Sequence, residues 1–101
     1  MKLIVNDNVV APAATVGDLG EAIRGLRAAG DDSFAVLSMS ESSFIQSVYA
    51  DGGLGLEYKN NGELFGCYDE LTDDRVIAAF TYFLNHDDRL RSEFNWESVK
   101  Y

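Results

Sequence analysis

Apolar and polar residues alternate along the chain with two periods, one typical of strands and the other of helices. Lys2–Val5 and Val9–Val10 are apolar runs on either side of a polar segment, Asn6-Asp7-Asn8, which predicts an N-terminal hairpin. A run of four further strands is predicted at Ser33–Met39, Ser43–Ala50, Leu54–Asn60 and Glu63–Tyr68. The last three of these strands are joined by short glycine-containing turns. They must therefore be antiparallel, because a parallel return needs a long crossover.

Two longer segments carry apolar residues at helical spacing. The first begins at Thr15, which fits a capping box with Asp18, and Gly30 is a natural stop for it. The second begins at Thr72. Its apolar stripe is the clearest in the chain and consists of Val76, Ile77, Phe80, Phe83 and Leu84.

The end of the chain is predicted as a short helical turn at Leu90–Phe94 followed by an extended segment, Asn95–Tyr101. The predicted order of elements is then β-β-α-β-β-β-β-α. This order predicts an α+β fold in one domain spanning residues 1–101. The N-terminal hairpin and the four-strand run form a mostly antiparallel sheet, and the two main helices pack on one face of it.

The turn at Asp51–Gly53 determines which side chains share a face of the sheet. If all three residues form the loop, Ala50 pairs with Leu54 and Ser47 lies opposite Glu57. The predicted core face then carries Phe44, Val48, Leu56 and Tyr58, with Gln46 as its only amide. The opposite, polar face carries Ile45, Ser47, Tyr49, Glu57 and Lys59.

The net charge of the chain argues against two classes of binding partner. The chain has 17 acidic and eight basic residues, a net charge of −9. Nucleic-acid binding needs a surplus of Lys and Arg, and anionic membrane surfaces attract basic segments, so neither partner is expected. A negative field favours association with a positively charged protein, although solubility alone explains the same composition.

The sequence also indicates in which compartment of the cell the protein is located. Its single cysteine cannot form an internal disulfide, and its first residues do not resemble a secretory signal. No apolar stretch approaches the roughly 20 residues that cross a bilayer. We therefore expect the protein in the reducing cytoplasm.

Candidate catalytic groups are few. Cys67 is the only thiol and His86 the only imidazole, which is too few for a zinc site. The usual role of a cysteine such as Cys67 is that of a small buried apolar residue, and His86 lies at the polar end of a helix. We expect no catalytic, metal or cofactor site. An enzyme that uses Cys67, His86 or Glu57 remains a competing hypothesis.

Four short segments occur in an order and spacing that resemble a known family. They are Phe44-Ile45-Gln46, Leu56-Glu57-Tyr58, Ala79–Leu84 and Phe94-Asn95-Trp96-Glu97. The second half of the chain thereby resembles small bacterial immunity proteins found beside polymorphic toxins, often deaminase toxins. The resemblance implies stoichiometric inhibition without catalysis, in which the protein docks on a cognate toxin and occludes its active site. The positions that match the family pattern are Gln46, Glu57, Trp96 and Glu97.

A contact surface follows from these expectations. It combines the polar sheet face with acidic loop residues and the matching family positions, and the full set is Gln46, Tyr49, Glu57, Lys59, Asp69, Glu70, Asp73, Asp74, Trp96 and Glu97. The expected partner is a basic toxin domain. For Trp96 we favour a structural role, in which the C-terminal segment folds back and the indole plugs the sheet edge. The competing function is a small cytoplasmic regulatory or adaptor domain that binds a host protein or works as a homodimer.

Overall fold

The structure is a computed structural model that describes residues 1–99. The strands are β1 (Lys2–Val5), β2 (Asn8–Ala11), β3 (Ser33–Ser40), β4 (Ser43–Ala50), β5 (Gly53–Leu54), β6 (Leu56–Asn60), β7 (Glu63–Cys67) and β8 (Glu97–Ser98). The helices are α1 (Val16–Ala29), α2 (Asp73–Leu84) and α3 (Arg89–Ser92). Of the extended segment predicted at Asn95–Tyr101, β8 forms a part, while Lys100 and Tyr101 lie outside the described residues.

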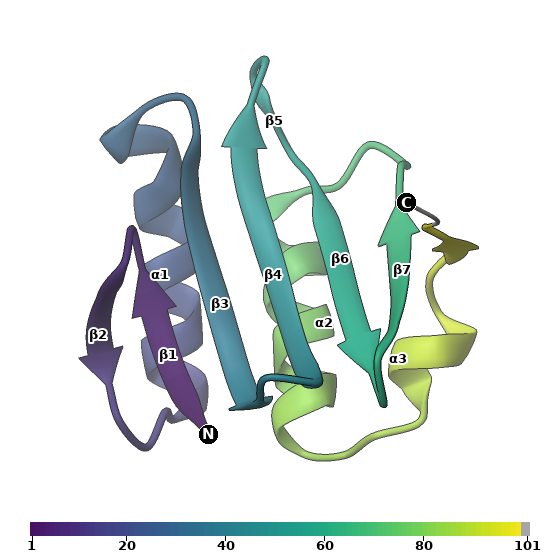
Figure 1. The fold of residues 1–101 in the computed structure, drawn as a ribbon. Coiled ribbons are helices and arrows are strands. Elements are labelled where there is room, and N and C mark those ends of the chain that lie inside the picture. The colour runs from purple at the N-terminus through teal and green to yellow at the C-terminus, as the bar shows by residue number, and fades with distance from the viewer. Residues whose placement is uncertain (100–101) are drawn as a thin grey trace.

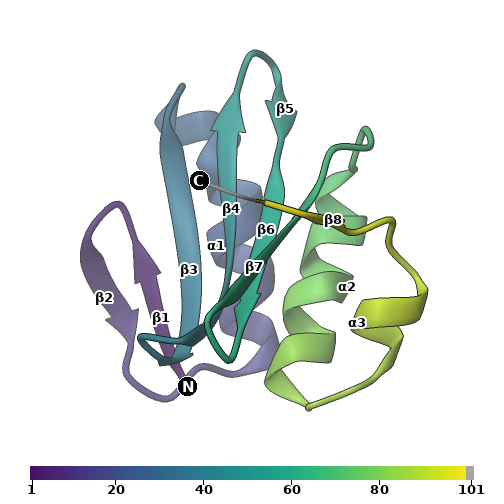
Figure 2. The ribbon, with the colours of Figure 1, turned by 45° about the vertical axis from the view of Figure 1, so that its right-hand side comes forward.

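All the strands join one antiparallel sheet, and the helices cover one of its faces (Figure 1). The strand order is β2-β1-β3-β4-β6-β7-β8, with β5 also paired to β4. Figure 1 shows α1 and α2 behind the sheet, and in the turned view of Figure 2 α2 lies beside the strands. The two helices contact one another. The predicted α+β class, with two main helices on one face, is confirmed.

The hairpin turns have the backbone conformation that their residues favour. Asn6 and Asp7 have φ of 48° and 68°, Asp51 and Gly52 have 54° and 79°, and Asn61 and Gly62 have 49° and 85°. Two central residues with positive φ give a turn whose twist matches that of the flanking strands, and Asn, Asp and Gly tolerate this conformation best. These three two-residue turns set the registers of the hairpins that they close, which are β1–β2, β4–β5 and β6–β7.

The helix ends follow the predicted capping signals. The Thr15 hydroxyl accepts a hydrogen bond from Asp18 N at 3.3 Å, and Asp18 Oδ2 accepts one from Thr15 N at 2.9 Å, which completes the capping box. Gly30 ends α1 with a φ of 101°. At α2, the Thr72 hydroxyl accepts from Arg75 N at 3.2 Å.

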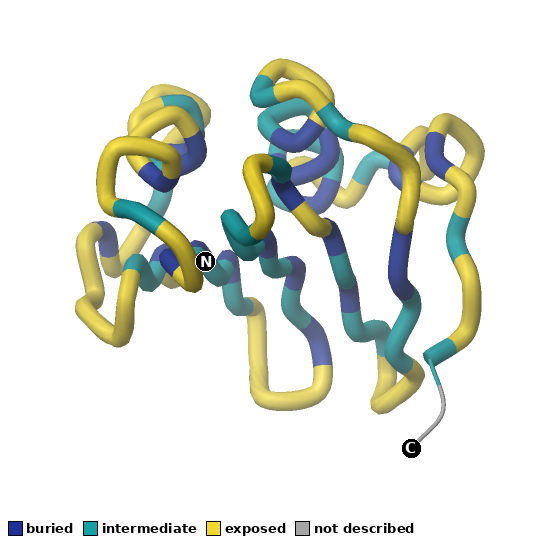
Figure 3. Tube along the Cα trace, turned by 90° about the horizontal axis from the view of Figure 1, so that it is seen from above, coloured by how far each residue is buried: buried dark blue, intermediate teal, exposed yellow. Residues whose placement is uncertain are grey.

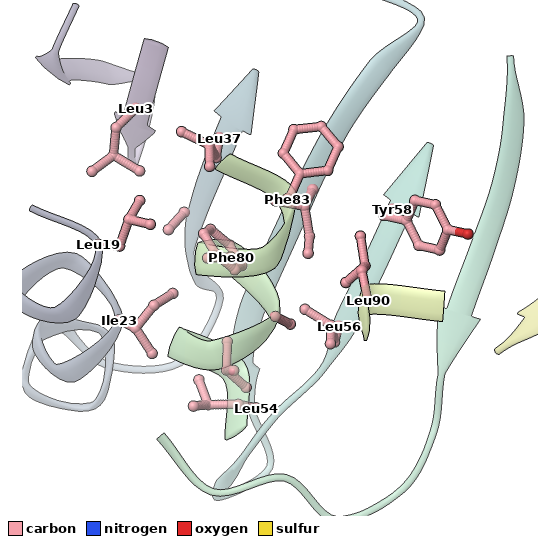
Figure 4. Close-up of a cluster of buried hydrophobic side chains, with 14 of the residues drawn as sticks. Leu3, Leu19, Ile23, Leu37, Leu54, Leu56, Tyr58, Phe80, Phe83 and Leu90 are labelled. Carbon is pink, nitrogen blue, oxygen red and sulfur yellow. The ribbon is translucent and has the colours of Figure 1, made fainter. Parts of the chain in front are cut away.

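The core lies between the two main helices and the sheet. Phe80 of α2 is fully buried, as are Leu19 and Ile23 of α1 and Leu37 of β3. Figure 4 shows these side chains gathered between the two layers. In the part of the chain that the structure describes, no helix combines the length and the apolar character needed to cross a membrane.

The predicted pairing of β4 is wrong by one residue. The turn has two residues instead of three, so Ala50 pairs with Gly53, Tyr49 with Leu54 and Gln46 with Glu57. Because side chains alternate along a strand, this shift exchanges the two faces of β4. Buried and half-buried residues alternate accordingly along the central strands in Figure 3.

The corrected register changes which residues form the core. Ile45 and Ser47 are buried with Leu56 and Tyr58, whereas Phe44, Gln46 and Val48 lie on the other side of the sheet. The buried Ser47 hydroxyl donates to Gly55 O at 2.6 Å, so its burial leaves no unpaired polar group. Phe44 and Val48 are therefore not core residues, contrary to the prediction.

A local ion pair before α3 leads to a pH prediction. Asp87 Oδ2 lies 2.6 Å from Arg89 Nη2, and hydrogen bonds from the Arg89 side chain and backbone hold the pKa of Asp87 below its usual range. We expect Arg89→Gln to raise the pKa of Asp87, measured by carbon-13 NMR titration of the carboxyl group. The matched variant Arg91→Gln should leave that pKa unchanged, and an equal shift in both variants would contradict the assignment.

The sign of the corresponding stability effect follows from linkage. The pKa of Asp87 is lower in the folded chain than in the unfolded chain, so the ion pair stabilises the folded chain fully only above the unfolded pKa. The stabilisation decreases as the pH falls through the folded pKa. The contribution is small, because the Arg89 side chain is 62% exposed.

Candidate functional site

The thiol of Cys67 and the imidazole of His86 do not meet. Cys67 ends β7 and is buried, and it lies before α2 in the chain, whereas His86 follows the other end of α2. The 12 residues of α2 span about 18 Å, so the thiol and the imidazole lie near opposite ends of that helix. Within residues 1–99, no group of three His, Cys, Asp or Glu side chains is arranged to hold a metal ion.

The distinctive surface is the face of the sheet that the helices leave uncovered, which we call the outer face. Its side chains alternate along the strands with the buried ones. They form cross-strand rows, such as Ile4–Val36–Gln46–Glu57. The members of the outer face are Lys2, Ile4, Phe34, Val36, Ser38, Phe44, Gln46, Val48, Glu57, Lys59, Leu64 and Glu97.

Five apolar side chains form a band on the outer face across β1, β3 and β4. This apolar band consists of Ile4, Phe34, Val36, Phe44 and Val48. Ile4 pairs with Val36 and Phe34 pairs with Val48, so the members are cross-strand neighbours. All five are half-buried, and none belongs to the core cluster or packs against it. Their apolar surface therefore faces away from the core of the chain.

Polar groups lie next to the band over β4 and β6. Gln46 Nε2 donates to Glu57 Oε1 at 3.0 Å, and Lys59 Nζ lies 5.9 Å from the centre of the Phe44 ring. Between these strands and β8, Phe44, Gln46, Lys59 and Leu64 line a shallow groove of about 540 Å³. An apolar band with a few fixed polar groups beside it is a typical arrangement for a protein-binding surface.

Tyr68 adds an exposed aromatic ring just beyond β7. Its side chain is 68% exposed, the highest value among the large apolar and aromatic residues described. A Cβ atom on residue 66 would lie 2.7 Å from the Tyr68 hydroxyl oxygen, so Gly66 gives the ring room to lie across the strand. Sequence reasoning missed Tyr68, and the only available signal was a glycine two positions before an aromatic residue at a strand end.

Gln46, Glu57, Lys59 and Glu97 are the predicted contact residues that the structure brings together on the outer face. Glu97 belongs to this group because it pairs with Gly66, which pairs with Glu57. Tyr49 is not among them, which corrects the prediction for this residue. It faces the helix layer, where the guanidinium of Arg27 lies 5.3 Å from its ring centre. The one-residue shift in the β4 pairing is the physical reason, because it turns the Tyr49 side chain to the helix side.

The predicted acidic residues lie near the ends of the strands and at the start of α2. Asp73 pairs with Arg27 at 3.0 Å and Asp74 with Arg24 at 2.6 Å, which links α2 to α1. The bond to Asp73 also raises the pKa of Arg27.

Asp69 accepts a hydrogen bond from Asn95 Nδ2 at 2.9 Å, which ties the loop after β7 to the C-terminal segment. Glu70 is exposed. Near these residues lie Asp31 and Asp32, which precede β3, and Asp51, which follows β4. We call the set Asp31, Asp32, Asp51, Asp69 and Glu70 the acidic end of the molecule.

Trp96 takes the structural role that the sequence favours. Its indole packs edge-on against Tyr58, with ring centres 4.5 Å apart, and donates a hydrogen bond to Leu90 O at 2.7 Å. The ring therefore closes the core beside β7. Glu97, the next residue, is exposed in β8 and pairs with Gly66.

Comparisons of the chain with models of known protein families, with curated proteins and with solved structures find no match.

Proposed function

We propose that this chain is a non-catalytic binding protein, and specifically an immunity protein that docks on a cognate bacterial toxin and occludes its active site. The observation that carries the proposal is the apolar band on the outer face. A two-layer domain buries most of its apolar side chains between the layers, and a rimmed apolar patch that stays partly accessible on the opposite face is typical of a protein-binding site. The resemblance of residues 44–97 to immunity proteins supports the choice of partner.

Charge supports a basic partner. The chain carries a net charge of −9, and the acidic end presents five carboxylates at one end of the antiparallel strands, before β3 and after β4 and β7. None of these five forms an ion pair within the described residues. Such a field raises the association rate with a positively charged toxin, and toxins that act on nucleic acid need basic surfaces. As an inhibitor of a toxin made in the same cell, the protein would act in the cytoplasm.

In this proposal, the outer face provides the contact area and the acidic end steers the encounter. Phe34, Phe44 and Tyr68 are the aromatic side chains available as anchors. Gln46 and Glu57, held together by their hydrogen bond, present a fixed polar group beside the band. Asp73, Asp74 and Trp96 stabilise the fold instead of contacting the toxin, because their side chains bind other residues of the same chain.

The direct test is co-expression with the product of the neighbouring gene. We expect the chain to restore growth of cells that express that product. We also expect purified chain and toxin domain to elute together at a one-to-one ratio in size-exclusion chromatography. The association rate should fall as salt rises from about 0.05 to 0.5 M, since charge steering is screened. Failure of both growth rescue and complex formation would contradict the immunity function.

A second copy of the chain is the competing occupant of the apolar band. Light scattering on the isolated protein distinguishes a toxin from a second copy as the partner that covers the apolar band. A monomer leaves the outer face free for a toxin. A stable dimer that Phe44→Lys dissociates would favour the regulatory or adaptor function instead.

A further inference from the structure

The Tyr68 side chain reaches over the outer face, although the residue itself follows the end of β7. A Cβ atom on residue 66 would lie 2.7 Å from the Tyr68 hydroxyl oxygen and 2.8 Å from the ring carbon that carries it. Gly66 lies opposite Glu57 of β6, and side chains directly opposite one another share a face of the sheet. The Tyr68 hydroxyl therefore occupies the place that a side chain of residue 66 would take on the outer face.

Two glutamates flank that place. Gly66 pairs with Glu57 of β6 on one side and with Glu97 of β8 on the other. Opposite residues on neighbouring strands have Cβ atoms about 4.5–5.5 Å apart, so both side chains begin close to the Tyr68 hydroxyl. Gln46 Nε2 donates to Glu57 Oε1 at 3.0 Å, which holds the Glu57 carboxylate in position, and Glu97 is exposed. Neither glutamate forms an ion pair within residues 1–99.

The Tyr68 ring is also open to solvent and to the acidic end. Its side chain is 68% exposed. It lines a cleft of about 790 Å³ together with Asp51, Asp69 and Glu70. The face of a tyrosine ring carries negative potential and attracts a cation. An accessible aromatic ring and carboxylates without a basic partner therefore lie together at this corner of the outer face.

We propose that Tyr68, Glu57 and Glu97 form a binding site for one arginine side chain of a protein partner. The guanidinium would stack on the ring and donate hydrogen bonds to the two carboxylates. Its planar shape and five donors suit this set of groups better than the compact ammonium of lysine does. The identification of the partner as the toxin rests on the proposed function, whereas the arginine site itself rests on the geometry of β6, β7 and β8.

Charge favours an arginine from another protein over one from a second copy of this chain. Every arginine of the chain belongs to one of the three helices, which cover the opposite face of the sheet (Figure 1). The outer face of a second copy therefore presents no arginine to the site. Two copies also carry the same net charge of −9, which opposes their association.

The first test uses the full chain labelled with nitrogen-15 and the capped peptide acetyl-Gly-Arg-Gly-amide, followed by NMR at low salt. We expect the largest shifts at the amides of Glu57, Gly66, Tyr68 and Glu97. The same peptide with citrulline, which has the shape of arginine without its charge, should cause no shifts at these amides. The lysine peptide should bind more weakly than the arginine peptide.

Variants at exposed residues show whether the site or the net charge binds the peptide. Tyr68→Ala and Glu97→Gln should each weaken binding of the arginine peptide by about two- to fivefold, the range of an exposed cation–π contact or ion pair. Glu41→Gln is the matched control, because it removes the same charge from an exposed glutamate in the turn between β3 and β4, and it should leave binding unchanged. Equal losses in Glu97→Gln and Glu41→Gln overturn the proposal, and so does equal binding of the arginine and citrulline peptides.

Dissociation kinetics with the cognate toxin domain distinguish this inference from the proposed function. Tyr68→Ala should raise the dissociation rate at least about fivefold and leave the association rate within about twofold, because losing a direct contact acts mainly on dissociation. If the complex forms and Tyr68→Ala changes neither rate, the arginine site is wrong and the immunity function stands. If the parent forms no complex but binds the arginine peptide, the immunity function is wrong and the site stands. A dimer in light scattering that Tyr68→Ala dissociates overturns the site in favour of a second copy.

Discussion

Replacing Phe80 by alanine is expected to lower the free energy of unfolding by about 3–5 kcal/mol, the usual cost of emptying a buried phenylalanine site. Phe80 is fully buried and is the largest of the fully buried side chains. It projects from α2 into the space that Leu19 of α1 and Leu37 of β3 also fill (Figure 4). Both layers of the fold lose contacts when the Phe80 ring is removed. The loss is large because the free energy of unfolding of most small domains is only about 5–15 kcal/mol.

Urea unfolding followed by circular dichroism measures this effect, and Phe44→Ala is the matched control. Phe44 is a half-buried phenylalanine of the apolar band, so its truncation should cost much less than that of Phe80. Ile45→Ala, one residue along the strand, should be the more harmful of the two neighbouring changes because Ile45 is fully buried. If Phe44→Ala destabilises the chain more than Ile45→Ala, the register of β4 is that of the sequence prediction.

The helices were predictable from the sequence, because capping residues and apolar periodicity are strong signals between residues close together in the chain. Thr15, Asp18 and Gly30 cap α1 as predicted, and α2 follows the apolar stripe that contains Phe80. The pairing of β4 was not predictable from hydrophobicity, since the wrong register buries Phe44 and Val48. The useful signal lay in the turn, where Asp51 and Gly52 suit two positive-φ positions and so favour a two-residue loop.

The one-residue error in the β4 pairing also limited what the sequence could predict about the candidate site. A pattern that places apolar residues inside assigns Phe44 and Val48 to the core, yet the structure leaves both on the outer face. Local preference and observed position disagree at these residues, and such disagreements concentrate at functional surfaces. Gln46, Glu57 and Lys59 were predicted as contact residues and do lie together. Tyr68 depends on the room at Gly66 and could be found only from the structure.

The second large effect is expected at the centre of the apolar band. Val36→Arg should weaken the complex with a cognate basic toxin at least about hundredfold, because it places a charge in a desolvated contact opposite a surface of the same sign. Val36 lies between Ile4 of β1 and Gln46 of β4 and is only half-buried. The arginine can therefore reach solvent in the free protein, and the free energy of unfolding should change by less than about 1 kcal/mol.

Isothermal titration calorimetry with the purified toxin domain measures the affinity, and two further variants interpret it. Val16→Arg places the same charge on an exposed valine of α1, away from the outer face, and should leave affinity within about threefold of the parent, as surface changes usually do. Val36→Glu desolvates a charge at the same position but attracts a basic partner, so it should weaken binding less than Val36→Arg. Equal losses for Val36→Arg and Val36→Glu would mean that the surface facing the band is not basic. Normal binding of Val36→Arg would remove the outer face from the interface, because no toxin that covers this face could accommodate a central arginine without a measurable loss.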